Sequence, residues 1–366
     1  MQIDFHYYAT YAAAYLAGYS HKECMDISYS AFMVDQCSKT LLKKLGADTS
    51  AATTMLQLEM MDAGGDIISL QEITAIWSSF HFLPKDLYAQ KSKHPKRYMH
   101  KYRLICGPDS ELVKKTVELA KGSSLQAAGI AMHVLADTWA HAYFAGTPSL
   151  VINNVDNDIY EITDPDDRLT DRRIVFNHNP ASPDDPEKNS YTNSMYVNNE
   201  NSVMNLGHGR AGHLPDYSFM RYRYMPAWDD YRMMIKDNPR DYHNAFCQMI
   251  HALKYLRGLT DSFETGVYDT DAVSPYDERI RQILGRRQLL ASDDWKQFAH
   301  DLSNEDIEDF DIDKYQDEYL MAVAGKRPDT FLGRFIDAAS AHKKMVCTQI
   351  AASKNPLAGF AGKIKE

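Results

Sequence analysis

Three side chains that could bind a metal ion recur at intervals of four residues in one alanine-rich segment of the sequence. They are His133, Asp137 and His141, in the stretch GIAMHVLADTWAHAYFAG. Because an α-helix turns by about 100° per residue, residues four apart lie on one face. Imidazole and carboxylate groups suit zinc, manganese or iron, and a lone carboxylate in an apolar helix is costly unless paired or metal-bound. The spacing therefore predicts a metal site; the alternative is two core histidines oriented by Asp137.

The segments around this helix predict a mainly helical protein. Apolar residues recur with helical spacing in residues 9–45, with a break at Gly18. Ser110 precedes a further helix as an expected cap, and Gly122-Ser123-Ser124 starts the alanine-rich one. Helical spacing returns in residues 242–259, 275–290 and 330–350. The β-branched and aromatic run ITAIWSSFHFLP, residues 73–84, instead predicts a short strand or an extended loop that ends at Pro84.

A long polar connection divides the chain. Residues 146–229 are rich in Asn, Asp, Pro and Gly, and a loop of this length in a globular chain is either functional or disordered. We therefore expect an all-α fold in three parts: a helical metal-site core in residues 1–145, a loop insertion in residues 146–235 with short strands at most, and C-terminal helices in residues 236–366 packed on the same domain.

The alanine-rich helix resembles the central helix of the zinc-dependent phospholipase C and single-strand-specific nuclease superfamily, which supplies a His, an Asp four residues later and a further His to a zinc cluster. Other short motifs match in the same order along residues 1–260. The residues that match are His6 in DFHYY, Asp35 in SAFMVDQ, His81 in SSFHFLP, and His208, His213 and Asp216 in GHGRAGHLPD. The chain resembles an uncharacterised branch of the superfamily more than its secreted enzymes.

The resemblance implies a multi-helix bundle that holds two or three zinc ions, with manganese or iron as alternatives. Asp35, His81, His133 and Asp137 would hold one ion, and Asp137 would bridge to a second ion held with His6. Better-known members also use the amino group of an N-terminal Trp, which is not present here; the carboxylate of Asp4 is the expected substitute.

His141 would join His208, His213 or Asp216 in a third site or complete a binuclear one, with His213 orienting a ligand as the alternative role. Better-known members place the second His six residues after the Asp, with a proline between, whereas here the gap is four without a proline. The number of metal ions therefore stays open.

The function implied by the resemblance is that of a metal-dependent phosphodiesterase, acting on a lipid or nucleotide-like phosphoester through a metal-activated water. Asp35 and Asp137 would act both as ligands and as proton acceptors, and Arg221 or Arg223 would hold the phosphate, because guanidinium matches it bidentately. Two alternatives stay open: a non-catalytic metal-stabilised protein whose insertion docks a protein partner, and a different metallohydrolase such as an amidase or esterase.

Composition narrows the class of protein. The formal charge of −10 argues against a general binder of duplex nucleic acid. Five scattered cysteines without a Cys-x-x-Cys pair argue against a disulfide framework. The sequence has no membrane-spanning apolar run and no typical secretory signal, so a cytoplasmic protein is the default expectation, with export without a cleavable signal as the alternative.

Four other patterns in the sequence have more ordinary explanations. His243, Cys247 and His251 repeat the spacing of four in a more ordinary helix, where core packing is the favoured role. The acidic residues between Asp156 and Asp167 do not have the Gly and Glu of a calcium-binding loop. The basic stretch 85–103 and the acidic stretch 303–318 are expected to be solvated surface.

Overall fold

The computed structural model describes residues 1–63, 67–89, 103–177, 179, 182–193 and 206–355, and these form a mainly helical protein with two small sheets. Much of the basic stretch 85–103 therefore lies outside the described residues. The helices of the N-terminal part are α1 (Thr10–Leu16), α2 (His21–Gln36), α3 (Lys39–Leu45), α4 (Gln57–Ala63), α5 (Ile67–Phe80), α6 (Glu111–Ala120) and α7 (Leu125–Ala140), preceded by the π-helical turn η1 (Asp4–Ala9).

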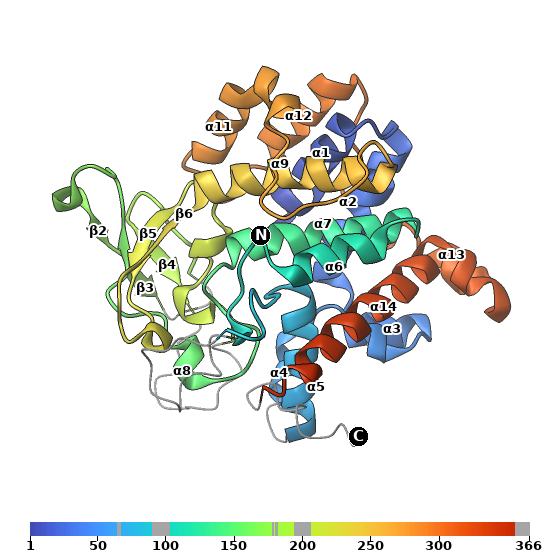
Figure 1. Cartoon of the computed structure of the whole chain (residues 1–366), viewed down its shortest axis with the longest axis horizontal. Helices are drawn as coiled ribbons and strands as arrows, with labels where there is room; N and C mark the ends of the chain where they lie inside the picture. Colours follow the sequence, from blue (N-terminus) through green and yellow to red (C-terminus); the bar gives the residue numbers. More distant parts are fainter. Residues whose placement is uncertain (64–66, 90–102, 178, 180–181, 194–205, 356–366) are drawn as a thin grey trace.

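Helix α7 is the centre of the helical part (Figure 1). It packs against α2, α6, α9 (Asn238–Arg257) and α14 (Phe331–Ala352). Its N-terminus is capped by Ser124, and nearly all of its side chains are buried. Gly129 allows the closest approach: a Cβ there would lie 2.4 Å from the Ile27 carbonyl oxygen of α2. The predicted alanine-rich helix is therefore the element around which the others assemble.

The run predicted as a strand or extended loop is a helix, so that prediction was wrong. Ile73, Ile76 and Phe80 of α5 recur at intervals of three and four residues and are fully buried, and α5 packs against α14 and α7. Burial of this face overrides the β propensity of its branched and aromatic residues. His81 follows directly, in the turn that ends α5.

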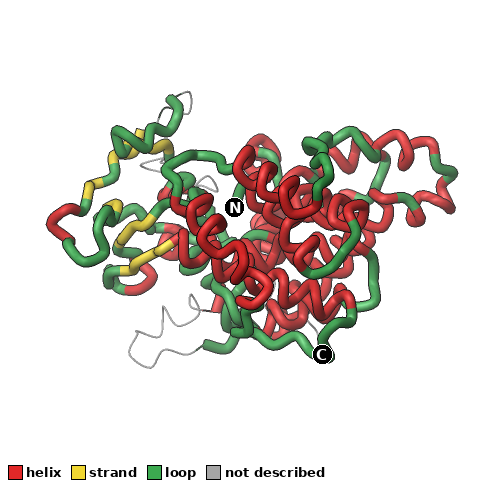
Figure 2. Tube along the Cα trace, turned by 90° about the horizontal axis from the view of Figure 1, so that it is seen from above, coloured by secondary structure: helices red, strands yellow, loops and turns green. Residues whose placement is uncertain are grey.

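The insertion forms a second, smaller core beside the bundle. Its four-stranded antiparallel sheet has the order β2–β1–β5–β6 and consists of β1 (Tyr160–Glu161), β2 (Arg172–Arg173), β5 (Arg221–Tyr224) and β6 (Met234–Asp237). A parallel pair joins β3 (Val175–Asn177) to β4 (Ser190–Thr192). Figure 2 shows these strands gathered at one end of the molecule. The strands are short, as expected for the insertion.

The C-terminal helices pack on the N-terminal ones. They comprise α10 (Thr270–Val273), α11 (Asp277–Gly285), α12 (Ser292–Ser303), α13 (Gln316–Met321) and α14. Helix α12 covers η1 and α1, while α14 runs across α5 and α7. One apolar cluster contains side chains from both ends of the chain, including Phe5, Trp295 and Phe335. The two halves of the bundle therefore share a core.

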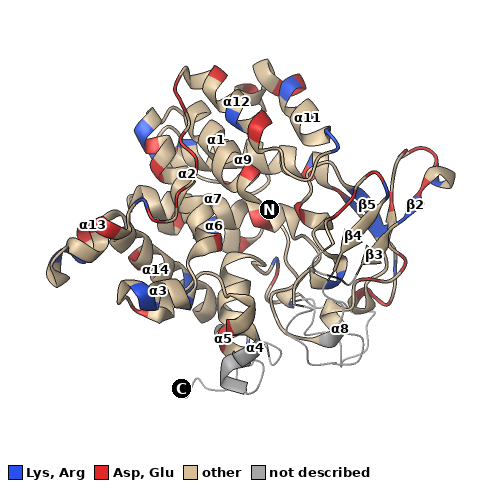
Figure 3. Cartoon of the chain, turned by 180° about the vertical axis from the view of Figure 1, so that it is seen from behind, with Lys and Arg blue, Asp and Glu red and all other residues tan. Residues whose placement is uncertain are grey.

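Charged side chains are peripheral in this arrangement. Figure 3 shows Lys, Arg, Asp and Glu on outer helices such as α3, α11 and α12 and on the insertion, around a largely uncharged centre. The single charged residue within α7 is Asp137, which is 1% exposed. A buried carboxylate at the centre of the protein needs a compensating charge.

Within the described residues, none of the helices is both long and apolar enough to cross a membrane.

Candidate metal centre

Groups from distant parts of the chain converge on Asp137 and Asp216. The contributing elements are η1, α2, the turn after α5, α7 with the turn that follows it, and the insertion. The structure brings together His6, Asp35, His81, His133, Asp137, His141, His208 and Asp216 in three groups, in each of which the potential ligand atoms lie within 4.8 Å of one another. We call these eight residues the central cluster.

The first group surrounds one oxygen of Asp137. His81 Nδ1 lies 3.3 Å and His133 Nε2 lies 3.2 Å from Asp137 Oδ2. Asp35 Oδ1 is 3.7 Å from His81 Nδ1 and 3.9 Å from His133 Nε2. These are the four residues expected to share one ion.

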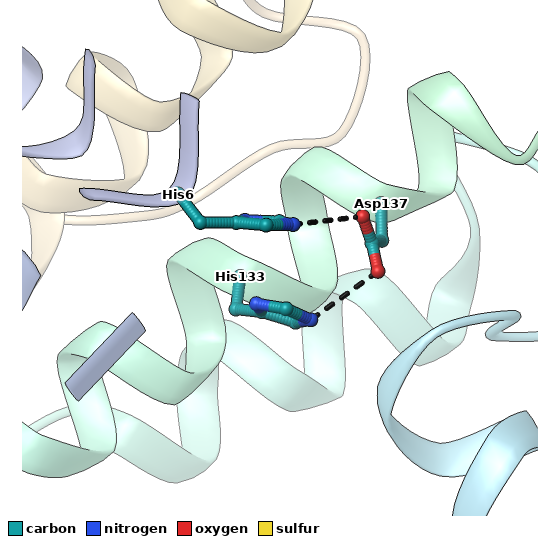
Figure 4. A group of neighbouring side chains, drawn as sticks. All are labelled: His6, His133 and Asp137. Carbon is teal, nitrogen blue, oxygen red and sulfur yellow. Dashed lines mark hydrogen bonds and ion pairs between the residues drawn. The ribbon is translucent and has the colours of Figure 1, made fainter. Parts of the chain in front are cut away.

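The second group involves the other oxygen of Asp137. His6 Nε2 lies 3.1 Å from Asp137 Oδ1, and the His6 ring stacks on His133 with centroids 3.8 Å apart (Figure 4). Burial lowers the pKa of His6 to about 4, and the nearby His133 lowers it further in the same direction. His6 is therefore neutral at pH 7, the form in which imidazole binds a metal. The two oxygens of Asp137 thus face two different imidazole groups, as a bridging carboxylate would.

The third group combines α7 with the insertion. His141 Nε2 lies 3.2 Å from Asp216 Oδ1, and His208 Nε2 lies 3.6 Å from Asp216 Oδ2. His213 Nδ1 also contacts Asp216 Oδ2, at 3.0 Å, but its side chain is 62% exposed. His213 therefore stands at the solvent edge of the centre and holds Asp216 from outside, which fits the alternative role expected for it.

The structure does not place Asp4 in the cluster, so that expectation was wrong. Its two oxygens accept hydrogen bonds from the backbone N–H groups of Phe5 and Ala291, at 2.8 and 3.0 Å. The amino group of Met1 occupies the expected position instead, 2.8 Å from Asp137 Oδ1 and 3.2 Å from Asp216 Oδ1. Burial alone would lower the pKa of this amino group, but the two carboxylates raise it to about 11. The resemblance pointed to an N-terminal amino group, but this group was set aside in favour of Asp4 because the chain does not have the Trp of the better-known members.

Hydrogen bonds to backbone carbonyls fix the orientation of three imidazoles. His81 Nε2–H donates to Thr53 O at 3.0 Å, His141 Nδ1–H to His81 O at 2.7 Å, and His208 Nδ1–H to Gly212 O at 2.7 Å. In a neutral ring the second nitrogen then presents a lone pair. In each case that nitrogen faces a carboxylate oxygen at 3.2–3.6 Å. Two acceptors at this distance need a proton, a metal ion or another cation beside them; for His141 Nε2 and Asp216 Oδ1 the Met1 amino group lies 3.3 and 3.2 Å away.

The charge states of the third group are those that a metal ion would need. Burial lowers the pKa of His208 to about 4, so this ring carries no second proton at pH 7. Burial would raise the pKa of Asp216, but His208 and the Met1 amino group hold it well below its usual value. With zinc–ligand bonds of about 2.0–2.1 Å, two ligands of a tetrahedral zinc ion lie about 3.3 Å apart. The residues present therefore fit zinc in donor type and in spacing.

The two arginines expected to bind phosphate lie elsewhere. Arg221 Nε binds Asp237 at 3.0 Å, and Arg223 binds Asp171 at 2.8 Å and Asp158 at 3.2 Å. Through these ion pairs both arginines stabilise the four-stranded sheet of the insertion. The ion pair of Asp158 also places part of the acidic loop in the sheet rather than in a calcium site.

The rival triple on α9 does not converge on one point. His243 Nε2 binds Asp277 at 2.6 Å, and Cys247 Sγ lies 3.8 Å from His243 Nδ1. His251 instead accepts a hydrogen bond from the Glu264 N–H group. Among the described residues, these three do not form a group of potential metal ligands.

Comparisons with known proteins add a family but no characterised relative. The family described as "Family of unknown function (DUF6765)" matches residues 1–350. Comparison with curated proteins and with solved structures found no match.

Proposed function

The chain belongs to this family of unknown function, and from the geometry of the central cluster we propose that it is a metal-dependent hydrolase that acts on phosphodiesters. The observation that carries the proposal is that three imidazoles each donate one N–H group to a backbone carbonyl and place the other ring nitrogen 3.2–3.6 Å from a buried carboxylate oxygen. Neutral histidines with only a packing role would donate their N–H group to those carboxylates, whereas three of these rings donate an N–H group to a backbone carbonyl. The resemblance to the zinc-dependent phospholipase C and nuclease superfamily supports the choice of reaction.

Each group has its own expected role. Asp35, His81, His133 and Asp137 would hold one ion, Asp137 and His6 a second, and His141, His208 and Asp216 a third. When bound, divalent ions would supply an activated water and positive charge for the phosphoryl group. Among the described residues, no Lys or Arg forms an ion pair with Asp35, Asp137 or Asp216. The Met1 amino group pairs with Asp137 and Asp216, and metal ions would supply the remaining positive charge for the three carboxylates.

Asp35 is the better placed of the two expected proton acceptors. Its side chain is 26% exposed, whereas that of Asp137 is 2% exposed and contacts imidazoles through both oxygens. Asp35 therefore lies on the open side of the first group, where a substrate would enter. Asp137 holds the imidazoles in position.

The test combines metal analysis with substrate turnover. We expect stoichiometric zinc, manganese or iron by elemental analysis, and hydrolysis of bis-p-nitrophenyl phosphate or phosphatidylcholine that a chelator abolishes. His133→Ala is expected to lower the number of metal ions per chain and to lower turnover by about 100-fold or more. His243→Ala is the matched control, because it removes a buried histidine with the same spacing of four outside the cluster. Protein without stoichiometric metal, or full turnover of His133→Ala, contradicts the proposal.

One observation favours a second candidate function, a metal-stabilised protein without catalytic activity. His6, His81, His133, Asp137 and His141 are each at most 4% exposed, whereas a catalytic metal keeps an open coordination position. This candidate predicts bound metal, a lower melting temperature after chelation, and no turnover of phosphodiesters or of p-nitrophenyl acetate. Turnover of the acetate alone would instead indicate a metal-dependent esterase.

A further inference from the structure

A cavity lies beside the end of α7, and it is lined by none of the eight residues of the central cluster. Its volume is about 330 Å³, within the range of small-molecule sites. Trp139 and Ala142 line the cavity, whereas Asp137 and His141 of the same segment point toward the other residues of the central cluster. The cavity is therefore separate from the candidate metal centre, although both use the same turn.

The walls of the cavity are aromatic and aliphatic. Trp139, Trp228 and Tyr143 provide ring surfaces, and Ile105 and Met234 add aliphatic surface. Trp139 and Trp228 are buried and therefore rigid, and Trp139 Nε1–H is fixed by a 2.8 Å hydrogen bond to Gln248. Flat, rigid walls of this kind suit a planar apolar group.

Lys85 is one of the two cations that line the cavity. No ion pair is formed by Lys85 in the described part of the chain. Its aliphatic stem lies against Gly107, where an added Cβ would come within 2.9 Å of Lys85 Cδ. The absence of a side chain at position 107 therefore lets Lys85 lie along the wall with its ammonium group available.

Two of the three carboxylates that line the cavity are paired with cations. Asp229 binds Arg232 at 2.5 Å, and Asp241 binds Lys236 at 2.7 Å and lies 3.6 Å from Arg240, the other lining cation. Asp86 accepts the Tyr88 N–H at 2.9 Å and keeps its negative charge. Counted with these partners, four cations stand against three carboxylates, so the net charge beside the cavity is positive.

Backbone strain marks the same place. Tyr143 has φ of 79°, in the left-handed region that a bulky side chain avoids. Its N–H donates to Cys106 O at 3.0 Å, which ties the strained turn to the opposite wall. Such strain persists where the surroundings impose it, and it is concentrated at ligand sites.

We propose that this cavity binds a compact aromatic anion, a flat ring system with one carboxylate or sulfonate group. The rings would lie between Trp139 and Trp228, and the anion would meet the Lys85 ammonium group. This proposal does not rest on hydrolase activity of the central cluster.

The experiment is a calorimetric titration of the metal-loaded protein with naphthalene-2-sulfonate. We expect one molecule per chain with a dissociation constant below about 1 mM. The neutral analogue 2-naphthylmethanol should bind about three- to tenfold more weakly, and Lys85→Gln should remove this difference between the two compounds. Lys114→Gln, which changes an exposed lysine of α6 that pairs with Glu264, should leave it unchanged.

A blocking variant locates the bound molecule. Ile235 lines the cavity but is 48% exposed, so Ile235→Trp should fill the opening without disturbing the core and should abolish binding. Absence of binding to the wild-type protein overturns the proposal. Binding that survives Ile235→Trp, or that disappears only when the metal is removed, also overturns it, because the sulfonate would then occupy another site.

Discussion

At the scale of single residues, Asp137 has the most demanding environment in the molecule. It is 1% exposed, and its two oxygens contact His6, His81, His133 and the amino group of Met1. Burial would raise the pKa of this carboxyl group, but His141, the amino group and the other imidazoles hold it well below its usual value. Asp137 is therefore ionised, and its charge organises the first two groups of the cluster.

Replacement of Asp137 by asparagine tests this role with almost no change in shape. Asp137→Asn should release at least one metal ion per chain, because the amide cannot bridge two groups that each need an anionic oxygen. Elemental analysis after gel filtration measures the loss. Asp26→Asn, at a buried carboxylate of α2 bound to Lys22, should keep the full metal content, and retention of all metal by Asp137→Asn would contradict the bridging role.

Local spacing together with the resemblance to the phospholipase C and nuclease superfamily predicted much of the candidate site. The spacing of four places His133, Asp137 and His141 at one end of α7, and short motifs located His6, Asp35 and His81. The amino group of Met1 was missed because the absence of the expected Trp favoured Asp4 in its place. Arg221 and Arg223 were misplaced because their partners Asp237 and Asp171 are set by strand pairing, which no local pattern of the insertion reveals.

At the scale of elements, the contact between α2 and α7 sets the position of the cluster. Asp35 lies on α2 and His133 on α7, and their ligand atoms meet because the helices approach closely at Gly129. A Cβ at this position would lie 2.4 Å from Ile27 O and 2.6 Å from Ser30 Cβ. Both obstacles belong to a packed helix and cannot rotate away.

Gly129→Ala should therefore destabilise the protein by about 1–3 kcal/mol, despite the higher helix propensity of alanine. Urea denaturation measures the free energy of unfolding. Gly285→Ala at the end of α11 is the control, since an added Cβ there meets nothing within 4 Å; it should be neutral or slightly stabilising. Equal stability of Gly129→Ala and wild type would show that α2 and α7 are farther apart than in this structure.

The contact between α14 and α5 carries a pH-dependent contribution to stability. His342 of α14 is buried, and its Nε2–H donates to Ser79 O of α5 at 2.9 Å. Burial lowers the pKa of His342 to about 4, below the value of about 6.5 for an unfolded chain. The unfolded state therefore binds the proton more tightly, so the free energy of unfolding is complete above pH 6.5 and falls as the pH drops toward 4.

The loss from this one residue should reach about 3 kcal/mol. His342→Gln removes the titration but keeps a donor, so its free energy of unfolding should fall less than that of wild type between pH 7 and pH 4.5. Urea denaturation at the two pH values measures the difference. His300→Gln, at a partly exposed histidine of α12, should follow the wild type, and an unchanged slope for His342→Gln would contradict the assignment.

Element type followed from sequence where periodicity and caps agreed and not where they conflicted. Ser110, Ser124 and Thr330 cap α6, α7 and α14 with side-chain hydrogen bonds, and all three helices were expected. Helix α5 was taken for a short strand or an extended loop because its residues favour strands, while the helix against which it buries one face, α14, is over 260 residues away. Local patterns do not contain that information.

At the scale of the whole molecule, the insertion must be held against the helical part for the third group to form. His208 and Asp216 belong to the insertion and His141 to the end of α7. Arg287, after α11, ties the two parts together: it pairs with Glu161 of β1 through both terminal nitrogens and reaches the Pro186 carbonyl oxygen. Glu161 is buried, so its carboxylate depends on this partner.

Arg287→Leu should loosen the insertion without unfolding the bundle. A buried carboxylate deprived of its main partner costs about 3–5 kcal/mol, and that cost falls on the sheet that contains β1. Hydrogen exchange should accelerate in peptides covering β1 and β4 and remain slow in α7. Because Asp216 and His208 move with the insertion, metal bound by the third group should be lost before metal bound at Asp35 and His81. Arg286→Leu is the neighbouring control, since this exposed arginine pairs with Asp294 at 2.6 Å. If both variants exchange like the wild type, other contacts hold the insertion and the third group does not depend on Arg287.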